Sequence, residues 1–332
     1  MAYTFQELPA GKVRRRIRIS NPNSNDVFCA LIASDNISAF EKVYGEVLYK
    51  GSILTQIANY FMDEVRKAGL KVWAIDTGDD LADNTTFGYF AKPINCELIV
   101  RRYLTGSLWR KLRDGQELPW EDLEELEEKG MFFYEFQRFD QPIFTPTLKD
   151  DANNDPPISE AELVDRGIIW DQEELAEIKN LCLKIFELGE RLADEHGLVL
   201  VDTKFEIGRD LQDGHLVIID EVLTPDSSRY WRDDLWDDFS PEINPIEISK
   251  EFVRQDIITL MIEQGLVSPD PSDDEIKAAA DKVQIPESKF AEWSEAYIQF
   301  YEDITGQVFN YSDRFHEEPL AVLENYLLNT QV

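Results

Sequence analysis

Cysteine and histidine, which carry much of the nucleophilic and zinc chemistry of enzymes, are scarce in this chain: its 332 residues include three of each. The cysteines are odd in number and far apart, which argues against a disulfide framework and indicates reduced thiols in a cytoplasmic protein. The histidines form no HExxH or Cys/His cluster, and no GxSxG segment is present. Zinc hydrolases and serine hydrolases built on those motifs are therefore not favoured.

Long apolar runs and basic residues are also lacking. No run is long enough to span a bilayer, and the first residues do not form the apolar core of a signal peptide. The 33 basic residues are outnumbered by 66 acidic ones, which gives a formal net charge of -33. Such a charge repels nucleic acid and anionic membrane surfaces, so we expect neither as a partner. The composition leaves open whether this acidity reflects adaptation to salt or high solubility.

The length and the 43% content of hydrophobic residues predict a substantial core and two closely associated domains. Apolar periodicity predicts a smaller N-terminal domain, residues 1–100, which ends near Val100. Its expected elements are strands at 16–19, 27–33, 71–75 and 96–103 and a helix at 52–68.

Residues 101–306 are expected to form a larger C-terminal domain, followed by a helical extension at 307–332. A polar loop is predicted at 142–159, and the helix at 172–196 should be capped by Asp171 with Glu174 at its third position. The other expected helices begin after Gly106 and span about 249–264, 272–283, 287–305 and 312–328.

The most informative segment is VDTKFEIG, residues 201–208, followed by DEVLTPDSSRYW, residues 220–231. Apolar residues at 198–201 and 216–219 predict two strands, and Asp213-Gly214 suits the turn between them. If the hairpin is symmetric about Asp213, Glu206 lies directly opposite Asp220, about 5 Å away between Cβ atoms. Two carboxylates so placed repel each other, and an oxygen-only pair indicates a bound Mg²⁺.

The alternation of side chains along a strand places Asp202, Lys204 and Glu206 on one face of this hairpin. One interpretation is a site for an anionic ligand and a metal ion. The alternative is a solvated face on which Lys204 merely screens the two acids, and the segment alone leaves both open.

The few basic residues gather in two places. The first lies at the loop GKVR, residues 11–14, where backbone N–H groups and an ammonium group could approach phosphates, although the neighbouring arginines could equally face water. The second lies in RRYLTGS, residues 101–107, where Gly106 and Ser107 precede a helix and could hold a phosphate beside Arg101. An ordinary serine cap would give the same local pattern.

Several motifs taken together resemble one family, the SAICAR synthetases (phosphoribosylaminoimidazole-succinocarboxamide synthases). The resemblance runs from about Gly11 to Gly306, and its most specific parts are VDTKFEIG and DEVLTPDSSR at this order and spacing. Its other motifs are GKVR, SDNISAF, YKG, RRYLTGS and LKDDANNDP. The resemblance implies an α+β, ATP-grasp-related fold of two domains with a nucleotide cleft between them. It also implies joining of L-aspartate to carboxyaminoimidazole ribonucleotide (CAIR), with conversion of ATP to ADP and phosphate through an acyl phosphate.

The same resemblance implies roles for individual residues, with ATP and Mg²⁺ as cofactors and CAIR and L-aspartate as small-molecule partners. The ATP phosphates would be bound by Gly11, Lys12, Val13, Arg14 and Lys204. Mg²⁺ would be bound by Glu206 and Asp220. The ribonucleotide would be bound by Arg101, Ser107, Asp226, Ser228 and Arg229. The catalytic residues would be Lys204, Asp202, Lys149 and Asp151. Whether the chain forms a homo-oligomer is left open.

Three features depart from the family pattern: Arg15 and Arg16 stand where an acid often follows the GKVR arginine, Asn154 stands where a histidine is common, and residues 307–332 extend beyond the resemblance. Two rival functions remain. A phosphotransferase on a related kinase-like fold would share the metal carboxylates but would not need the arginines near Ser107. In a non-catalytic acidic binding protein, the paired carboxylates and the clustered basic residues would be a coincidence, which the order of the motifs disfavours.

Overall fold

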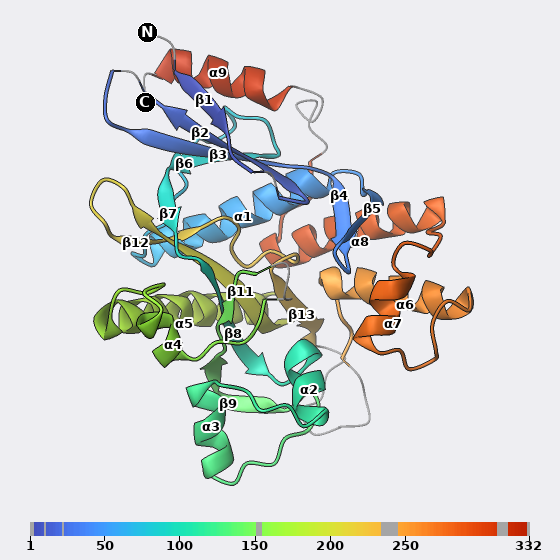
Figure 1. Ribbon diagram of the computed structural model, residues 1–332. Coiled ribbons are helices and arrows are strands. Elements are labelled where there is room, and N and C mark those ends of the chain that lie inside the picture. Colours follow the sequence, from blue (N-terminus) through green and yellow to red (C-terminus); the bar gives the residue numbers. More distant parts are fainter. Residues whose placement is uncertain are drawn as a thin grey trace.

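The computed structural model of the chain describes residues 3–9, 11–21, 23–150, 155–233, 245–310 and 318–330. They form a four-stranded sheet and a larger, seven-stranded sheet, with helices between and around them (Figure 1). This mixture of antiparallel strands and helices confirms the α+β class expected from the sequence.

The four-stranded sheet has the order β1-β2-β3-β6 and is antiparallel throughout. Its strands are β1 (Thr4–Glu7), β2 (Arg14–Ser20), β3 (Val27–Ala33) and β6 (Thr85–Tyr89). A small hairpin of β4 (Asn36–Ala39) and β5 (Lys42–Glu46) follows β3. The predicted β-hairpin of residues 16–33 is thereby confirmed as β2 and β3.

Helix α1 (Lys50–Lys67) confirms the amphipathic pattern seen at 52–68. Its apolar stripe, which includes Ile53, Ile57 and Phe61, is completely buried. Figure 1 places α1 between the four-stranded sheet and the long central strand β11, so one helix contributes to the packing of both sheets.

The seven-stranded sheet is built around β11 (Leu198–Asp210), which pairs with β7, β8, β12 and β13. The other strands of this sheet are β7 (Ala91–Pro93), β8 (Cys96–Tyr103), β9 (Arg138–Phe144), β10 (Thr147–Leu148), β12 (Leu216–Ile219) and β13 (Ser228–Arg232). Helix α5 (Gln172–Glu195) packs on β11, and the Asp171 side chain accepts a hydrogen bond from the backbone N–H of Glu174, as the cap prediction requires. A single strand thus carries the centre of the larger sheet.

Three sequence predictions for this region are wrong. The strand at 96–103 exists, but β8 pairs with β11 instead of completing the N-terminal sheet. Residues 71–75 form only two isolated bridges, Val72 with Ile218 and Ala74 with Gly88, and so connect the two sheets. The predicted loop at 142–159 contains the end of β9 and all of β10. Each error concerns long-range pairing, which local periodicity does not encode.

The remaining helices surround the larger sheet or cover the smaller one. They are α2 (Gly106–Arg113), α3 (Glu121–Glu128), α4 (Glu160–Asp165), α6 (Lys250–Glu263), α7 (Asp273–Ala279), α8 (Glu287–Thr305) and α9 (Pro319–Thr330). Part of the expected C-terminal extension is the helix α9, which begins at Pro319, whereas residues 311–317 lie outside the described part of the chain. Leu323 and Leu327 of α9 pack against Ile17, Ile19 and Phe28 of the four-stranded sheet (Figure 1). Among the described residues, no helix combines the length and apolarity that crossing a membrane would require.

Candidate active site

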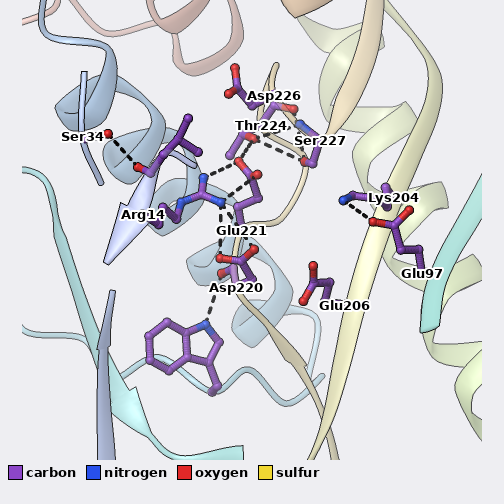
Figure 2. Close-up of polar contacts among 12 residues, drawn as sticks. Arg14, Ser34, Glu97, Lys204, Glu206, Asp220, Glu221, Thr224, Asp226 and Ser227 are labelled. Carbon is purple, nitrogen blue, oxygen red and sulfur yellow. Dashed lines mark hydrogen bonds and ion pairs between the residues drawn. The ribbon is translucent and has the colours of Figure 1, made fainter. Parts of the chain in front are cut away.

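The two carboxylates singled out in the hairpin lie near each other but not directly opposite. Glu206 of β11 is paired with Ile219 of β12, and Asp220 is the next residue, with a left-handed φ of 59°. The predicted register is therefore wrong by one residue: Arg209 pairs with Leu216, so the hairpin is centred between Gln212 and Asp213 and not on Asp213. Figure 2 shows the Glu206 side chain next to that of Asp220. Burial raises the pKa of Asp220 against the opposing effect of Arg14, and the charge of Glu206 adds to the increase.

Arg14 of the GKVR loop reaches these carboxylates from the four-stranded sheet. Its Nη1 and Nη2 donate to Glu221 Oε1 at 2.8 Å and Oε2 at 2.6 Å, and Nη1 also lies 3.3 Å from Asp220 Oδ1. Although burial opposes the charged form, the charges of Glu221 and Asp220 raise the pKa of Arg14. Glu221 was missed in the sequence because it lies outside the alternating face, yet it forms the bidentate contact that fixes Arg14.

A cavity of about 450 Å³ opens beside this arginine and is lined by the whole GKVR loop. The loop is closed by a hydrogen bond from the N–H of Gly11 to the carbonyl of Arg14, 3.0 Å long. The Ser34 hydroxyl donates to the carbonyl of Val13 at 3.0 Å and holds the loop against the end of β3. Four residues predicted to bind ATP, Gly11 to Arg14, therefore share one cavity.

Lys204 and Lys149 approach the hairpin face from neighbouring segments. Lys204 Nζ donates to Glu97 Oε1 of β8 at 2.7 Å, and Lys149 Nζ donates to Glu206 Oε1 at 2.6 Å. Burial lowers the pKa of Lys204, but the charges of Glu97 and Glu206 outweigh it and raise the pKa overall. Glu97 was missed because it lies on another strand. Asp151 and Asn154, which the sequence placed in this region, lie outside the described residues.

Arg101 and Arg229 are held by one carboxylate. Each Nη1 donates to Asp202 Oδ2 at 2.7 Å, because Asp202 is paired with Arg101 on one side of β11 and with Arg229 on the other. Arg229 Nε also lies 3.9 Å from Glu251 Oε2, so two guanidinium groups face two carboxylates here. Guanidinium groups bind phosphate in bidentate geometry, which suits this pair to an anionic ligand. Gly106, with φ of 60°, is required here because an added Cβ would lie 2.4 Å from the Arg229 guanidinium.

Ser107 and Ser228 flank this arginine pair in different ways. Ser107 lies in the first turn of α2, where backbone N–H groups are available to an anion. The Ser228 hydroxyl is buried and lies 2.7 Å from the hydroxyl of Thr203. Of the two, Ser107 is therefore the more suitable to contact a phosphate directly.

Glu206 and Asp220 provide a donor set that suits Mg²⁺. Both are carboxylates, and Mg²⁺ prefers one or two such ligands together with water and phosphate oxygens. No group of three or more His, Cys, Asp or Glu side chains arranged for metal binding occurs in the described part of the chain. The pair therefore fits an ion that also needs substrate oxygens, and does not fit a closed structural metal site.

Glu247, close to the arginine pair, provides a pH-dependent prediction. Burial raises its pKa from 4.5 to about 7 despite hydrogen bonds from Ser249. Since the folded state then binds a proton that the unfolded state has lost, the stability of the wild type should fall between pH 4.5 and about 7, by up to about 3 kcal/mol. Glu247→Gln should flatten this part of the profile, measured by urea unfolding at pH 5, 6, 7 and 8. An unchanged slope in the variant would contradict the assignment.

Comparison with known families decides the affiliation of this chain. A sequence model of the SAICAR synthetase family matches residues 7–267. The chain belongs to this family. Phosphoribosylaminoimidazole-succinocarboxamide synthase of Azobacteroides pseudotrichonymphae is 33% identical over 317 residues, which cover 91% of this chain and 87% of the relative. The same enzyme of Flavobacterium psychrophilum is 33% identical, over 95% of this chain and 94% of its own length.

Solved SAICAR synthetase structures share the fold. The Saccharomyces cerevisiae SAICAR synthase complexed with SAICAR has a TM-score of 0.70 at 23% identity, covering 92% of this chain and 97% of that one. A type-2 SAICAR synthetase in complex with ADP has a TM-score of 0.62 at 22% identity, covering 92% of this chain and all of the other. Membership confirms the resemblance drawn from the motifs of the sequence.

Proposed function

We propose that this chain joins L-aspartate to carboxyaminoimidazole ribonucleotide in an ATP-dependent reaction that yields SAICAR, ADP and phosphate in purine biosynthesis. Family membership and the full-length similarity to phosphoribosylaminoimidazole-succinocarboxamide synthases support this function. The observation that carries the proposal within the structure is the arrangement of β11. Asp202 with its two arginines, Lys204 with Glu97, and Glu206 beside Asp220 follow one another along the strand.

This row of side chains can contact two anionic groups of one ligand at separate points. Successive residues of a strand rise about 3.3 Å, so Asp202 and Glu206 are separated by roughly 13 Å. We assign the phosphate of the ribonucleotide to Arg101, Arg229 and the first turn of α2 at one end of this row. Its imidazole carboxylate then lies toward Lys204 and Glu206 at the other end. Ser228 and Asp226 lie next to this row but have partners within the protein: Ser228 contacts Thr203, and Asp226 accepts from Tyr297 and Lys50.

The ATP phosphates are assigned to the cavity beside the GKVR loop. Lys12 and the backbone of Gly11 and Val13 border this cavity, and Arg14 lies between it and Asp220. The loop belongs to the four-stranded sheet and the carboxylates to the larger one, which supports a two-domain, ATP-grasp-related arrangement with the nucleotide between the domains. Bound at Glu206 and Asp220, Mg²⁺ would neutralise charge on the ATP phosphates.

The chemistry then follows from positioning. A carboxylate oxygen of the ribonucleotide attacks the γ-phosphorus of ATP, the bond to the β-γ bridging oxygen breaks, and ADP leaves. The neutral amine of aspartate attacks the carbon of the resulting acyl phosphate, the carbon-oxygen bond to phosphate breaks, and the nitrogen loses a proton. We assign to the ammonium group of Lys204 the role of stabilising the negative charge that develops on the transferred group. The side chain of Lys149 is 37% exposed, so it can break its ion pair with Glu206 and orient the incoming carboxylates.

Product analysis tests the proposed reaction. Purified protein should release ADP and phosphate rapidly only when ATP, Mg²⁺, the ribonucleotide and L-aspartate are all present. Chromatography should then detect the amide formed from the ribonucleotide and L-aspartate. Parallel reactions without aspartate provide the control, since a phosphotransferase would form a phosphorylated acceptor without it. Folded, nucleotide-binding protein that forms no succinocarboxamide would refute the proposal.

A further inference from the structure

The carboxylate of Asp226 is surrounded by donors from three helices. Its Oδ1 accepts from the hydroxyl of Tyr297 in α8 at 2.6 Å. Its Oδ2 accepts from Lys50 Nζ at the start of α1 at 2.8 Å and from Lys250 Nζ at the start of α6 at 3.1 Å. We call these four residues the Asp226 cluster. The side chain of Asp226 is only 4% exposed, and that of Lys50 is fully buried.

The charges of the Asp226 cluster depend on one another. Burial opposes ionisation of Asp226, but the charges of Lys250 and Lys50 and the hydrogen bonds from Lys50 and Tyr297 hold its pKa well below the usual range. Burial lowers the pKa of Lys50, and the charge of Asp226 opposes that effect. Since both oxygens of Asp226 are already occupied inside the protein, this side chain is poorly placed to contact a substrate.

Asp226 belongs to a short turn that joins the parts of the candidate site (Figure 2). Within the turn, the N–H groups of Ser227 and Ser228 donate to the carbonyl of Thr224 at 3.1 and 2.9 Å. On one side, the Thr224 hydroxyl donates to Glu221, the partner of Arg14. On the other, the N–H of Lys204 donates to the carbonyl of Ser227 at 2.9 Å. A displacement of Asp226 would therefore be transmitted to both Arg14 and Lys204.

Tyr297 lies outside the part of the chain that the family model matches, because that match ends at residue 267. Helix α8, which carries Tyr297, packs on α1 next to the four-stranded sheet (Figure 1). Its Ser294 hydroxyl donates to the carbonyl of Leu48 at 2.8 Å, two residues before Lys50. An aromatic ring of the same helix, Phe290, lies so close to Gly45 that an added Cβ would be 2.7 Å from it. The helix is thus fixed against the segment that leads to Lys50.

We propose that Tyr297 and Lys50 are positioning residues for the reaction, which act through Asp226 by fixing the turn of residues 224–228. The proposal rests on the function proposed above. It extends the catalytic machinery to α8, and it assigns Asp226 to holding the turn in place of the direct substrate contact expected from the sequence. Lys250 reinforces the same carboxylate from α6.

Tyr297→Phe tests this proposal with little change in volume, and Tyr301→Phe is the matched control. Tyr301 lies one turn further along α8, is also largely buried, and has its hydroxyl 3.5 Å from Gln307, away from the Asp226 cluster. Tyr297→Phe should lower kcat about tenfold, because a misplacement of about 1 Å can cost roughly a hundredfold and Lys50 and Lys250 still hold Asp226 in the variant. The KM values for ATP and the ribonucleotide should stay within about threefold. Tyr301→Phe should retain wild-type kcat.

Hydrogen–deuterium exchange of the backbone supplies a readout that does not depend on activity. The backbone amides of Thr224 and of residues 226–228 should exchange faster in Tyr297→Phe than in the wild type, and Tyr301→Phe should leave them unchanged. A purely stabilising role would lower the melting temperature without changing kcat at a temperature well below it, and that result would overturn the proposal. So would unchanged exchange in the turn. If the wild type formed no SAICAR, the proposed function would fail, and the exchange data alone would still decide whether Tyr297 holds the turn.

Discussion

Glu206→Gln is expected to lower the turnover of SAICAR formation by roughly a thousandfold, and Asp220→Asn should have a similar effect. Each substitution keeps the shape of the side chain but removes a negative charge from the pair assigned to Mg²⁺. The measurement is kcat at saturating ATP and substrates over a series of Mg²⁺ concentrations. Asp210→Asn is the control, because Asp210 lies at the far end of the same strand and accepts from the N–H of Gln212 in the turn beyond it.

The folded state should tolerate both changes. Burial already raises the pKa of Asp220, so a neutral amide replaces a charge that the site disfavours. In Glu206→Gln, the amide oxygen of the new side chain can still accept the hydrogen bond from Lys149. Melting temperatures without metal should therefore stay within a few degrees of the wild type. Variants that fold and still turn over within about tenfold of the wild type would place the metal elsewhere.

Arg229→Ala is expected to raise the KM for the ribonucleotide about thirtyfold and to leave the KM for ATP nearly unchanged. A charge-assisted contact to phosphate contributes roughly 2 kcal/mol, which corresponds to that factor. Asp202 remains paired with Arg101, so the substitution does not leave its carboxylate without a partner. Arg232→Ala on the same strand is the control, since Arg232 pairs with Asp303.

The two anion sites can be separated by the same steady-state measurements. Lys12→Ala, at the cavity lined by the GKVR loop, should chiefly raise the KM for ATP. If Arg229→Ala impaired ATP use and spared the ribonucleotide, the assignments of the two sites would have to be exchanged. If neither KM changed, the phosphate would bind outside the arginine pair held by Asp202.

Local sequence features predicted much of the fold and the centre of the candidate site. Apolar periodicity placed α1 and α5 within two residues, because each helix buries one continuous stripe. Alternation along β11 placed Asp202, Lys204 and Glu206 in one row, and the structure gives them partners in the same order. The motifs of the sequence supplied the family, which the comparisons confirmed.

The errors concern contacts between distant segments. The register of Glu206 depended on the centre of the turn, which lies between Gln212 and Asp213. The left-handed φ of Asp220 could not be predicted, because Asp220 is not a glycine. Glu97 and Glu221 were missed because their partners, Lys204 and Arg14, lie on other elements far away in the sequence. Lys50 lay within the YKG motif, but its burial against Asp226 depends on the packing of α1 and α8.

The packing of α9 on the four-stranded sheet has a consequence for biosynthesis of the chain on the ribosome. Phe28 and its neighbours are made long before Leu323 and Leu327, which cover them. The apolar outer face of β2 and β3 therefore stays uncovered until translation has passed Leu327. Uncovered apolar surface favours aggregation, so this interval is when the nascent chain is most prone to aggregate.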